Sequence, residues 1–320
     1  MIRFGLVGLG QMGRHHARVM IQSSEVFFTG AVDPEGDRNN VVGTGQIFEA
    51  LDQLLAAGVD AAVVAVPTAH HRDIALQLAA AGVHTLIEKP LADTVPAAKE
   101  IQAGFEAKEI LGAVGHVERF NSALQEMERR LRADELGRVI SISTERVGPF
   151  PHRIHDVGVV KDLATHDIDI ATWIGGAPFA EVSGQLAHKM GRPHEDLVVA
   201  TGRLANDVVV SMNVNWLTPV KRRQVSVLGE KGAFVADLLA GDLYFFANAE
   251  VGSQWDRIAQ MRGVSEGDMV RYAFPKREPL AVEHEAFRAA IDQGHAEGVV
   301  SLAQGVEILE VAEEIIGGRT

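Results

Sequence analysis

The first third of the chain alternates short apolar runs with longer segments in which apolar residues recur every three or four positions. The apolar runs are continuous, as in Ala61–Val66, which is typical of strands buried on both faces of a sheet. The pattern predicts strands over Arg3–Val7, Phe27–Asp33, Ala61–Val66, His84–Glu88 and Leu111–Val114. It predicts helices over 12–23, 47–56, 71–81 and 97–108. This alternation indicates a doubly wound α/β domain with a parallel sheet.

From about Phe120 onward the strands become longer, and apolar and polar residues alternate along them, as in Val198–Leu204 and Val208–Asn215. Such alternation indicates a sheet with one face in water. Helices are predicted over 122–133, 161–173, 281–293 and 302–316, whereas 248–267 has no clear period and stays unassigned. We therefore expect two domains, a doubly wound domain over residues 1–119 and an α+β domain over residues 120–320.

Composition narrows the classes of function. The 320 residues are 47% hydrophobic and 23% charged, as in a folded protein, and the net charge of −13 disfavours nucleic acid and anionic membranes as partners. The absence of cysteine excludes disulfides, thiolate nucleophiles and iron–sulfur clusters. No apolar run is long enough to span a bilayer, and the first residues do not resemble a signal peptide, so a cytoplasmic protein is expected.

A glycine-rich loop follows the first predicted strand and opens the first helix. Gly8-Leu9-Gly10-Gln11-Met12-Gly13 matches G-x-G-x-x-G, a pattern that lets a pyrophosphate approach the backbone and the helix N-terminus. Asp33 ends the second predicted strand, where an acidic side chain accepts a hydrogen bond from a ribose 2′-hydroxyl. The pair predicts NAD as cofactor and makes NADP less favourable, although Arg38 stands where an arginine can accept a 2′-phosphate.

Two further places carry candidate chemistry. Lys89 follows a predicted strand, and Pro90 disfavours a helical backbone for it, so the lysine is expected extended at the carboxyl edge of the sheet. Asp162 and His166 share one helical face, a pairing suited to taking a proton from a hydroxyl. Taken alone, the pair fits a surface i,i+4 contact better.

Histidines also raise the alternative of a metal site. His166, Asp167 and Asp169 have further possible ligands nearby in the sequence, namely His152, His155 and Asp156. None of these spacings matches a known metal motif, so no metal is predicted. His15-His16 and His70-His71 stand at the starts of predicted helices and are expected to cap or pack rather than to bind a metal.

Together these motifs resemble the glucose–fructose oxidoreductase / inositol dehydrogenase (Gfo/Idh/MocA) family. The resemblance rests on the glycine loop, on Glu88-Lys89-Pro90, on His116–Asn121, on Asp162-x-x-x-His166 and on Pro67-Thr68-x-x-His71, where threonine replaces the family's asparagine. It implies a Rossmann domain followed by an open, mostly antiparallel sheet whose outer face builds a homodimer or homotetramer. It also implies Lys89, Asp162 and His166 as the catalytic set, and it extends the cofactor site to Pro67, Thr68, His71, Glu88 and Pro90.

A narrower likeness concerns the substrate. Residues 146–151 and 156–169 are similar to the corresponding segments of UDP-N-acetylglucosamine 3-dehydrogenases within that family, and His116–Asn121 agrees with this. A nucleotide-sugar site needs cations for its diphosphate, and Arg119, Arg146, Arg153 and Lys221-Arg222-Arg223 are available. Asn121, in the same motif as Arg119, is also expected at the substrate. Two other functions stay open, a dehydrogenase of free polyols or monosaccharides and a non-catalytic NAD-binding sensor or co-regulator on the same fold.

Overall fold

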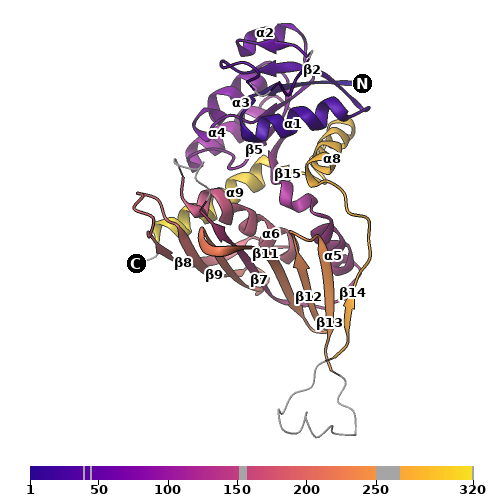
Figure 1. The fold of residues 1–320 in the computed structure, drawn as a ribbon, viewed down its shortest axis with the longest axis vertical. Helices are drawn as coiled ribbons and strands as arrows, with labels where there is room; N and C mark the ends of the chain where they lie inside the picture. The colour runs from indigo at the N-terminus through magenta and orange to yellow at the C-terminus, as the bar shows by residue number, and fades with distance from the viewer. Residues whose placement is uncertain (39, 44, 151–156, 250–266, 319–320) are drawn as a thin grey trace, which may run out of the picture. The chain divides into compact units, whose positions relative to one another are not determined.

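The computed structural model describes residues 1–38, 40–43, 45–150, 157–249 and 267–318 (Figure 1). The chain forms two compact units, each described below by itself. The first comprises Met1–Phe120 and Glu278–Glu310, and the second comprises Asn121–Arg277 and Val311–Thr320.

A seven-stranded sheet forms the centre of the first unit, in the order β15-β6-β5-β4-β1-β2-β3. Its strands are β1 (Ile2–Val7), β2 (Val26–Val32), β3 (Ile47–Phe48), β4 (Ala61–Val64), β5 (His84–Glu88), β6 (Gly112–Gly115) and β15 (Val300–Ser301). All neighbours are parallel except β15, which pairs antiparallel with β6. The four residues of β4 are fully buried, because helices cover both faces of a parallel sheet.

The helices of the first unit are α1 (Gln11–Gln22), α2 (Leu51–Ala56), α3 (His71–Ala80), α4 (Val95–Glu106) and α8 (Pro279–Gln293), with α9 (Leu302–Gly317) beginning in this unit. One core cluster joins β1 to α1 and α8 through Phe4, Met20 and Phe287. A second cluster, which includes Val7 and Leu54, joins the sheet to α2 on the other side. Helix α8 lies beside α1 although more than half of the chain separates them in sequence (Figure 1).

An eight-stranded sheet forms the second unit, in the order β14-β13-β12-β11-β7-β10-β9-β8. Its strands are β7 (Val139–Pro149), β8 (Phe179–Ala187), β9 (Leu197–Leu204), β10 (Val209–Asn215), β11 (Leu217–Gly229), β12 (Gly232–Asp237), β13 (Asp242–Ala247) and β14 (Met269–Arg271). Only β7 and β10 run parallel, and every other pair is antiparallel. Helix α5 (Ser122–Arg132) packs on β12 and β13, and α6 (Thr165–Gly175) packs on β7.

The observed architecture confirms the predicted fold class, a doubly wound domain with a mostly antiparallel second sheet. The boundary between the units falls after Phe120, one residue from the predicted one, but Glu278–Glu310 returns to the first unit. The predicted helix over 47–56 is wrong at its start, because Ile47 and Phe48 extend the sheet beside Ala31 and Val32. Within the described residues, no helix is long and apolar enough to cross a membrane.

Candidate functional site

Three predicted segments follow neighbouring parallel strands of the first unit. Strand β4 pairs with β1 on one side and with β5 on the other, so their carboxyl ends lie side by side. The glycine loop follows β1, Pro67–His71 follows β4, and Lys89 follows β5. Open α/β sheets bind ligands at this edge. The topology therefore assembles one candidate site from segments that are far apart in sequence.

The glycines of the loop meet the steric demands of a dinucleotide. Gly8 has φ +97°, and a Cβ there would lie 2.6 Å from the carbonyl oxygen of Ala65. A Cβ on Gly13 would clash with the carbonyl oxygen of Gly8, so this position holds helix α1 against the strand. A Cβ on Gly10 would meet nothing within 4 Å, which leaves open space beside the start of α1. No side chain caps α1, so its first amides are available to a phosphate.

Asp33 lines the open space beside Gly10. Its Oδ2 accepts a hydrogen bond from the Leu9 amide at 2.7 Å, and its Oδ1 accepts one from the Glu35 amide at 2.8 Å. A cavity of about 190 Å³ lies here, lined by Leu9, Gly10, Gln11, Arg14, Asp33, Glu35, Gly36 and Arg38. A carboxylate fixed beside the glycine loop is suited to the hydroxyls of a ribose. The residues present thus fit NAD.

Arg38 and Met12 lie at the margin of this site. The Arg38 guanidinium pairs with the Glu35 carboxylate at 2.7 Å, and both side chains are exposed. Asp33 and Glu35 thus place two carboxylates among the residues that line the cavity. Met12 and Gln11 are exposed on the first turn of α1.

His71 fastens the second segment to the third. Its buried ring places Nε2 3.0 Å from the carbonyl oxygen of Val66 and Nδ1 3.0 Å from that of Pro90. Burial lowers the pKa of His71. Pro67 is exposed and Thr68 half-buried at the start of a short 3-10 turn, Thr68–His70. His71 thereby connects the segment around the 3-10 turn to the Lys89–Pro90 segment, whose peptide bond is cis.

Glu88 is buried directly before Lys89, which is itself half-buried. Its Oε2 accepts a hydrogen bond from the Lys89 amide at 3.1 Å, and its Oε1 lies 2.8 Å from Nε2 of His16. Burial acts to raise the pKa of Glu88, but the hydrogen bond from His16 and the charges of His16 and Lys89 bring it below its usual value. The sequence pattern predicted only a capping or packing role for His16, and no local pattern indicated His284, whose Nε2 lies 2.8 Å from Nδ1 of His16.

In the second unit, Asp162 lies within a π-helical turn, Val160–Ala164, and His166 lies in the first turn of α6, which continues from it. Such turns interrupt the hydrogen-bond ladder and are frequent at functional sites. The turn is held by Glu195, whose Oε1 accepts a hydrogen bond from the Val160 amide at 2.9 Å. Any Cβ on Gly158 would clash with this carboxylate. Gly158 and Glu195 are therefore structural requirements of the turn that sequence analysis did not identify.

Arg146 is a buried structural cation. Its Nε donates to the Asp167 carboxylate at 2.7 Å, and the two side chains are 2% and 1% exposed. The pair fastens strand β7 to helix α6 next to His166. We therefore do not assign Arg146 to a substrate diphosphate, because its guanidinium already neutralises a buried carboxylate.

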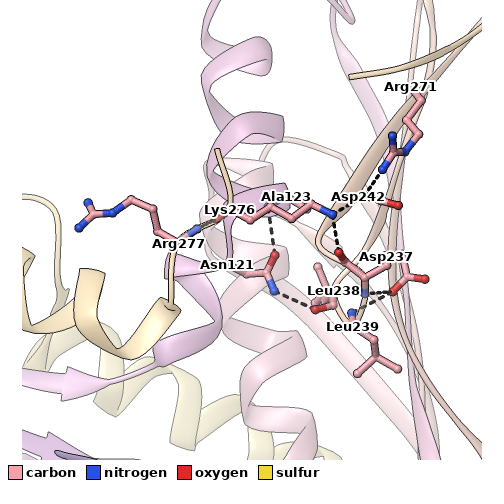
Figure 2. A network of polar contacts seen from close by, with 11 residues as sticks. Asn121, Ala123, Asp237, Leu238, Leu239, Asp242, Arg271, Lys276 and Arg277 are labelled. Carbon is pink, nitrogen blue, oxygen red and sulfur yellow. Dashed lines mark hydrogen bonds and ion pairs between the residues drawn. The ribbon is translucent and has the colours of Figure 1, made fainter. Parts of the chain in front are cut away.

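Asn121 caps helix α5 (Figure 2). Its Oδ1 accepts a hydrogen bond from the Ala123 amide at 3.0 Å, and its Nδ2 donates to the Leu238 carbonyl at 3.0 Å. In the same view Lys276 and Arg271 converge on Asp242 of β13. Both the oxygen and the nitrogen of the Asn121 side-chain amide therefore form hydrogen bonds within the second unit. Arg119 is buried in a 3-10 turn, Val117–Phe120, of the first unit.

Some sequence candidates lie outside the described residues. These are Arg153, predicted to bind substrate, and His152, His155 and Asp156, the possible metal ligands. Within the part of the chain that the structure describes, no three His, Asp or Glu side chains are grouped to hold a metal ion.

A dinucleotide loop with an acidic partner, a lysine at the same edge of the parallel sheet and a separate mostly antiparallel sheet define an NAD-binding oxidoreductase class. The profile of the oxidoreductase family with an NAD-binding Rossmann fold matches residues 2–116, and that of the GFO/IDH/MocA C-terminal domain matches residues 124–235. The chain belongs to the Gfo/Idh/MocA family of oxidoreductases. The predicted family and the predicted oxidoreductase class are thereby confirmed.

Individual relatives act on different substrates. The chain is 28% identical to a UDP-N-acetylglucosamine 3-dehydrogenase of Acidithiobacillus ferrooxidans, over 91% of this chain and 88% of that protein. It is 28% identical to inositol 2-dehydrogenase 2 of Saccharopolyspora erythraea, over 71% of this chain and 72% of that protein. A solved structure of the Acidithiobacillus enzyme superimposes with a TM-score of 0.84 at 26% identity, covering 98% of this chain and 96% of that one.

Proposed function

We propose that the protein is an NAD-dependent dehydrogenase that oxidises a secondary hydroxyl of a sugar, and that the sugar is carried on a nucleotide. The observation that carries the proposal is the fixed glycine loop with Asp33, at the same edge of the sheet as Lys89, which follows β5, one strand beyond β4. The first supplies a cofactor site and the second a cation for the reacting oxygen.

NAD is proposed over NADP because of charge. The Asp33 carboxylate is held in place by two amides, so it can accept from a ribose 2′-hydroxyl and would repel a 2′-phosphate. Arg38, the residue that favours NADP, is engaged by Glu35. When bound, NAD supplies the hydride acceptor of the reaction.

The chain's own residues handle the proton and the oxygen in this proposal. His166 accepts the proton of the substrate hydroxyl, and Asp162 orients the hydroxyl. The Lys89 ammonium stabilises the negative charge that develops on the oxygen as hydride leaves carbon. The products are a ketone, the reduced cofactor and a proton held by His166.

A nucleotide sugar is favoured by the relative that matches nearly the whole chain, a UDP-N-acetylglucosamine 3-dehydrogenase. The diphosphate of such a substrate requires cations, and we keep Arg119 and Arg153 as proposed ligands. Asn121 is proposed only as support for this region, since its side chain already caps α5.

A second candidate is oxidation of a free polyol, because inositol 2-dehydrogenases are similar to the chain at comparable identity. The two candidates differ in their need for a nucleotide. Thermal melts with NAD plus UDP, and initial rates with NAD plus UDP-N-acetylglucosamine or myo-inositol, separate them. Stabilisation by UDP and turnover of the nucleotide sugar support the first candidate. Turnover of inositol without any effect of UDP supports the second.

We also propose a homo-oligomer that forms through the outer face of the second sheet. Register places an apolar row across six strands on one face, and its large members are 41–60% exposed. The row consists of Met269, Phe246, Ala233, Leu228, Ser141 and Val209. Four large exposed apolar side chains in one row, with only the small Ala233 and Ser141 between them, favour association.

A further inference from the structure

Hydrogen bonds between buried side chains connect helix α8 with the main chain of Lys89. His284 Nε2 lies 2.8 Å from His16 Nδ1, and His16 Nε2 lies 2.8 Å from Glu88 Oε1. The other oxygen of Glu88 accepts from the Lys89 amide at 3.1 Å. His16 and His284 are 268 positions apart in sequence, and all four residues lie in the first unit.

Burial makes this connection energetically demanding. The side chains of His16 and Glu88 are 0% and 8% exposed. A buried carboxylate is stable only when charges or hydrogen bonds replace its lost water. Both carboxylate oxygens of Glu88 have a hydrogen-bond partner: Oε1 contacts His16, and Oε2 accepts from the backbone amide of Lys89. Glu88 therefore stays ionised and is fixed in one orientation.

The second histidine holds the first. Burial, together with the charge of His16, lowers the pKa of His284 well below its usual value, so its ring is neutral. If His16 is an imidazolium, it donates to both neighbours. If it is neutral, it donates from Nε2 to Glu88 and accepts at Nδ1 from His284. In both states the contacts fix the ring plane of His16 and keep a donor on Glu88.

Gly115 and Phe4 lie close to the two ends of this arrangement. A Cβ on Gly115, which pairs with Glu88 across β5 and β6, would lie 3.5 Å from the Glu88 carboxyl carbon. On the other side, the Phe4 ring lies 6.5 Å from the His284 ring, between centroids. The hydrogen bonds to His16 and to the Lys89 amide are therefore what hold the Glu88 carboxylate in place.

We propose that His16 and His284 are positioning residues for Lys89 that act through Glu88, by holding its carboxylate on the Lys89 amide. The inference rests on the proposed function in that Lys89 is taken as the residue that touches substrate. Neither histidine contacts substrate or cofactor in this proposal, and their effect on turnover passes entirely through the placement of the lysine.

The test compares His284→Met, which removes the contact to His16, with His284→Gln, whose amide can donate or accept at the same place. Full-length protein is labelled with ¹⁵N-lysine, and the Lys89 amide is identified by its loss in Lys89→Arg. We expect His284→Met and Glu88→Gln to shift this amide resonance and His284→Gln to restore it. His15→Gln, on the exposed face of α1, is the matched control. If His284→Met does not fold, His284→Asn, too short to reach His16, replaces it.

Kinetics supply the second readout. Because small misplacements of reacting groups can cost about a hundredfold in rate, His284→Met should lower kcat by about tenfold to a hundredfold with NAD affinity nearly unchanged. Combined with Glu88→Gln it should cause no further loss, since both changes act through one contact. An unmoved Lys89 amide, or losses that multiply in the double variant, would overturn the inference. If the wild type oxidises no sugar, the proposed function fails, and the amide resonance still decides this inference.

Discussion

The Asp33 carboxylate accepts a hydrogen bond at 2.7 Å from the amide of Leu9, inside the glycine loop. This hydrogen bond joins the acidic residue that follows β2 to the loop that follows β1. It fixes the charge of Asp33 in the cavity that Gly10 and Arg38 also line. The proposed preference for NAD over NADP rests on this contact.

Replacing Asp33 by asparagine should weaken that preference. The amide keeps an acceptor for Leu9 but removes the charge that would repel a 2′-phosphate. We expect the ratio of kcat/KM for NAD over NADP to fall by about tenfold, equivalent to about 1.4 kcal/mol. Asp37→Asn is the control, because Asp37 accepts from the Val41 and Val42 amides and does not line the cavity. An unchanged ratio in Asp33→Asn would remove the charge argument.

The buried pair of Arg146 and Asp167 makes a prediction that separates a structural from a binding role. Arg146→Met leaves a buried carboxylate without its partner, which should cost about 3–5 kcal/mol of unfolding free energy. Arg146→Met combined with Asp167→Leu should recover much of this loss. Denaturant unfolding measures both. If Arg146→Met instead weakens UDP binding while stability is unchanged, Arg146 belongs to the substrate site after all.

Stability should depend on pH through His284. Burial lowers its pKa in the folded protein, whereas the unfolded chain takes up the proton near the usual value of 6.5. Below that pH the unfolded state binds more protons, so stability falls as pH falls. In His284→Gln the decrease in Tm between about pH 7 and pH 5 should therefore be smaller. His295→Gln controls for loss of an exposed histidine. Parallel Tm curves for the wild type and His284→Gln would contradict the assignment.

The apolar row on the second sheet predicts an assembly that single charges can break. Leu228→Glu or Val209→Glu would place like charges opposite one another in a symmetric interface. Light scattering coupled to gel filtration should report a smaller species for either variant. Val220→Glu, at an exposed position of β11 outside the row, should retain the wild-type mass. A monomeric wild type would reject the proposed interface.

Local spacing explains which features could be predicted from sequence. The glycine loop and Asp33 belong to one βαβ unit, so their positions follow from strand and helix lengths. Continuous apolar runs likewise predicted a sheet covered on both faces, and β4 is fully buried. Alternating runs predicted the second sheet, because one of its faces is exposed.

Contacts between distant segments could not be predicted in this way. His16, Glu88 and His284 meet because α8 returns to the first unit, and no local pattern carries that information. Arg146 was predicted to bind a phosphate because the sequence shows its positive charge but not that the side chain forms an ion pair with Asp167. Phe48 fitted a helical period, but pairing with Val32 at the sheet edge prevailed over it.

The central claim is that Lys89 is catalytic in an NAD-dependent oxidation of a sugar hydroxyl. The direct measurement is the rate of NAD reduction with UDP-N-acetylglucosamine by the wild type and by Lys89→Met, together with the NAD affinity of each. Lys99→Met, an exposed lysine of α4 that pairs with Glu310, is the control. We predict turnover by the wild type and a loss of about a hundredfold to ten-thousandfold in Lys89→Met, with NAD binding retained. Equal turnover by Lys89→Met and the wild type would contradict the account.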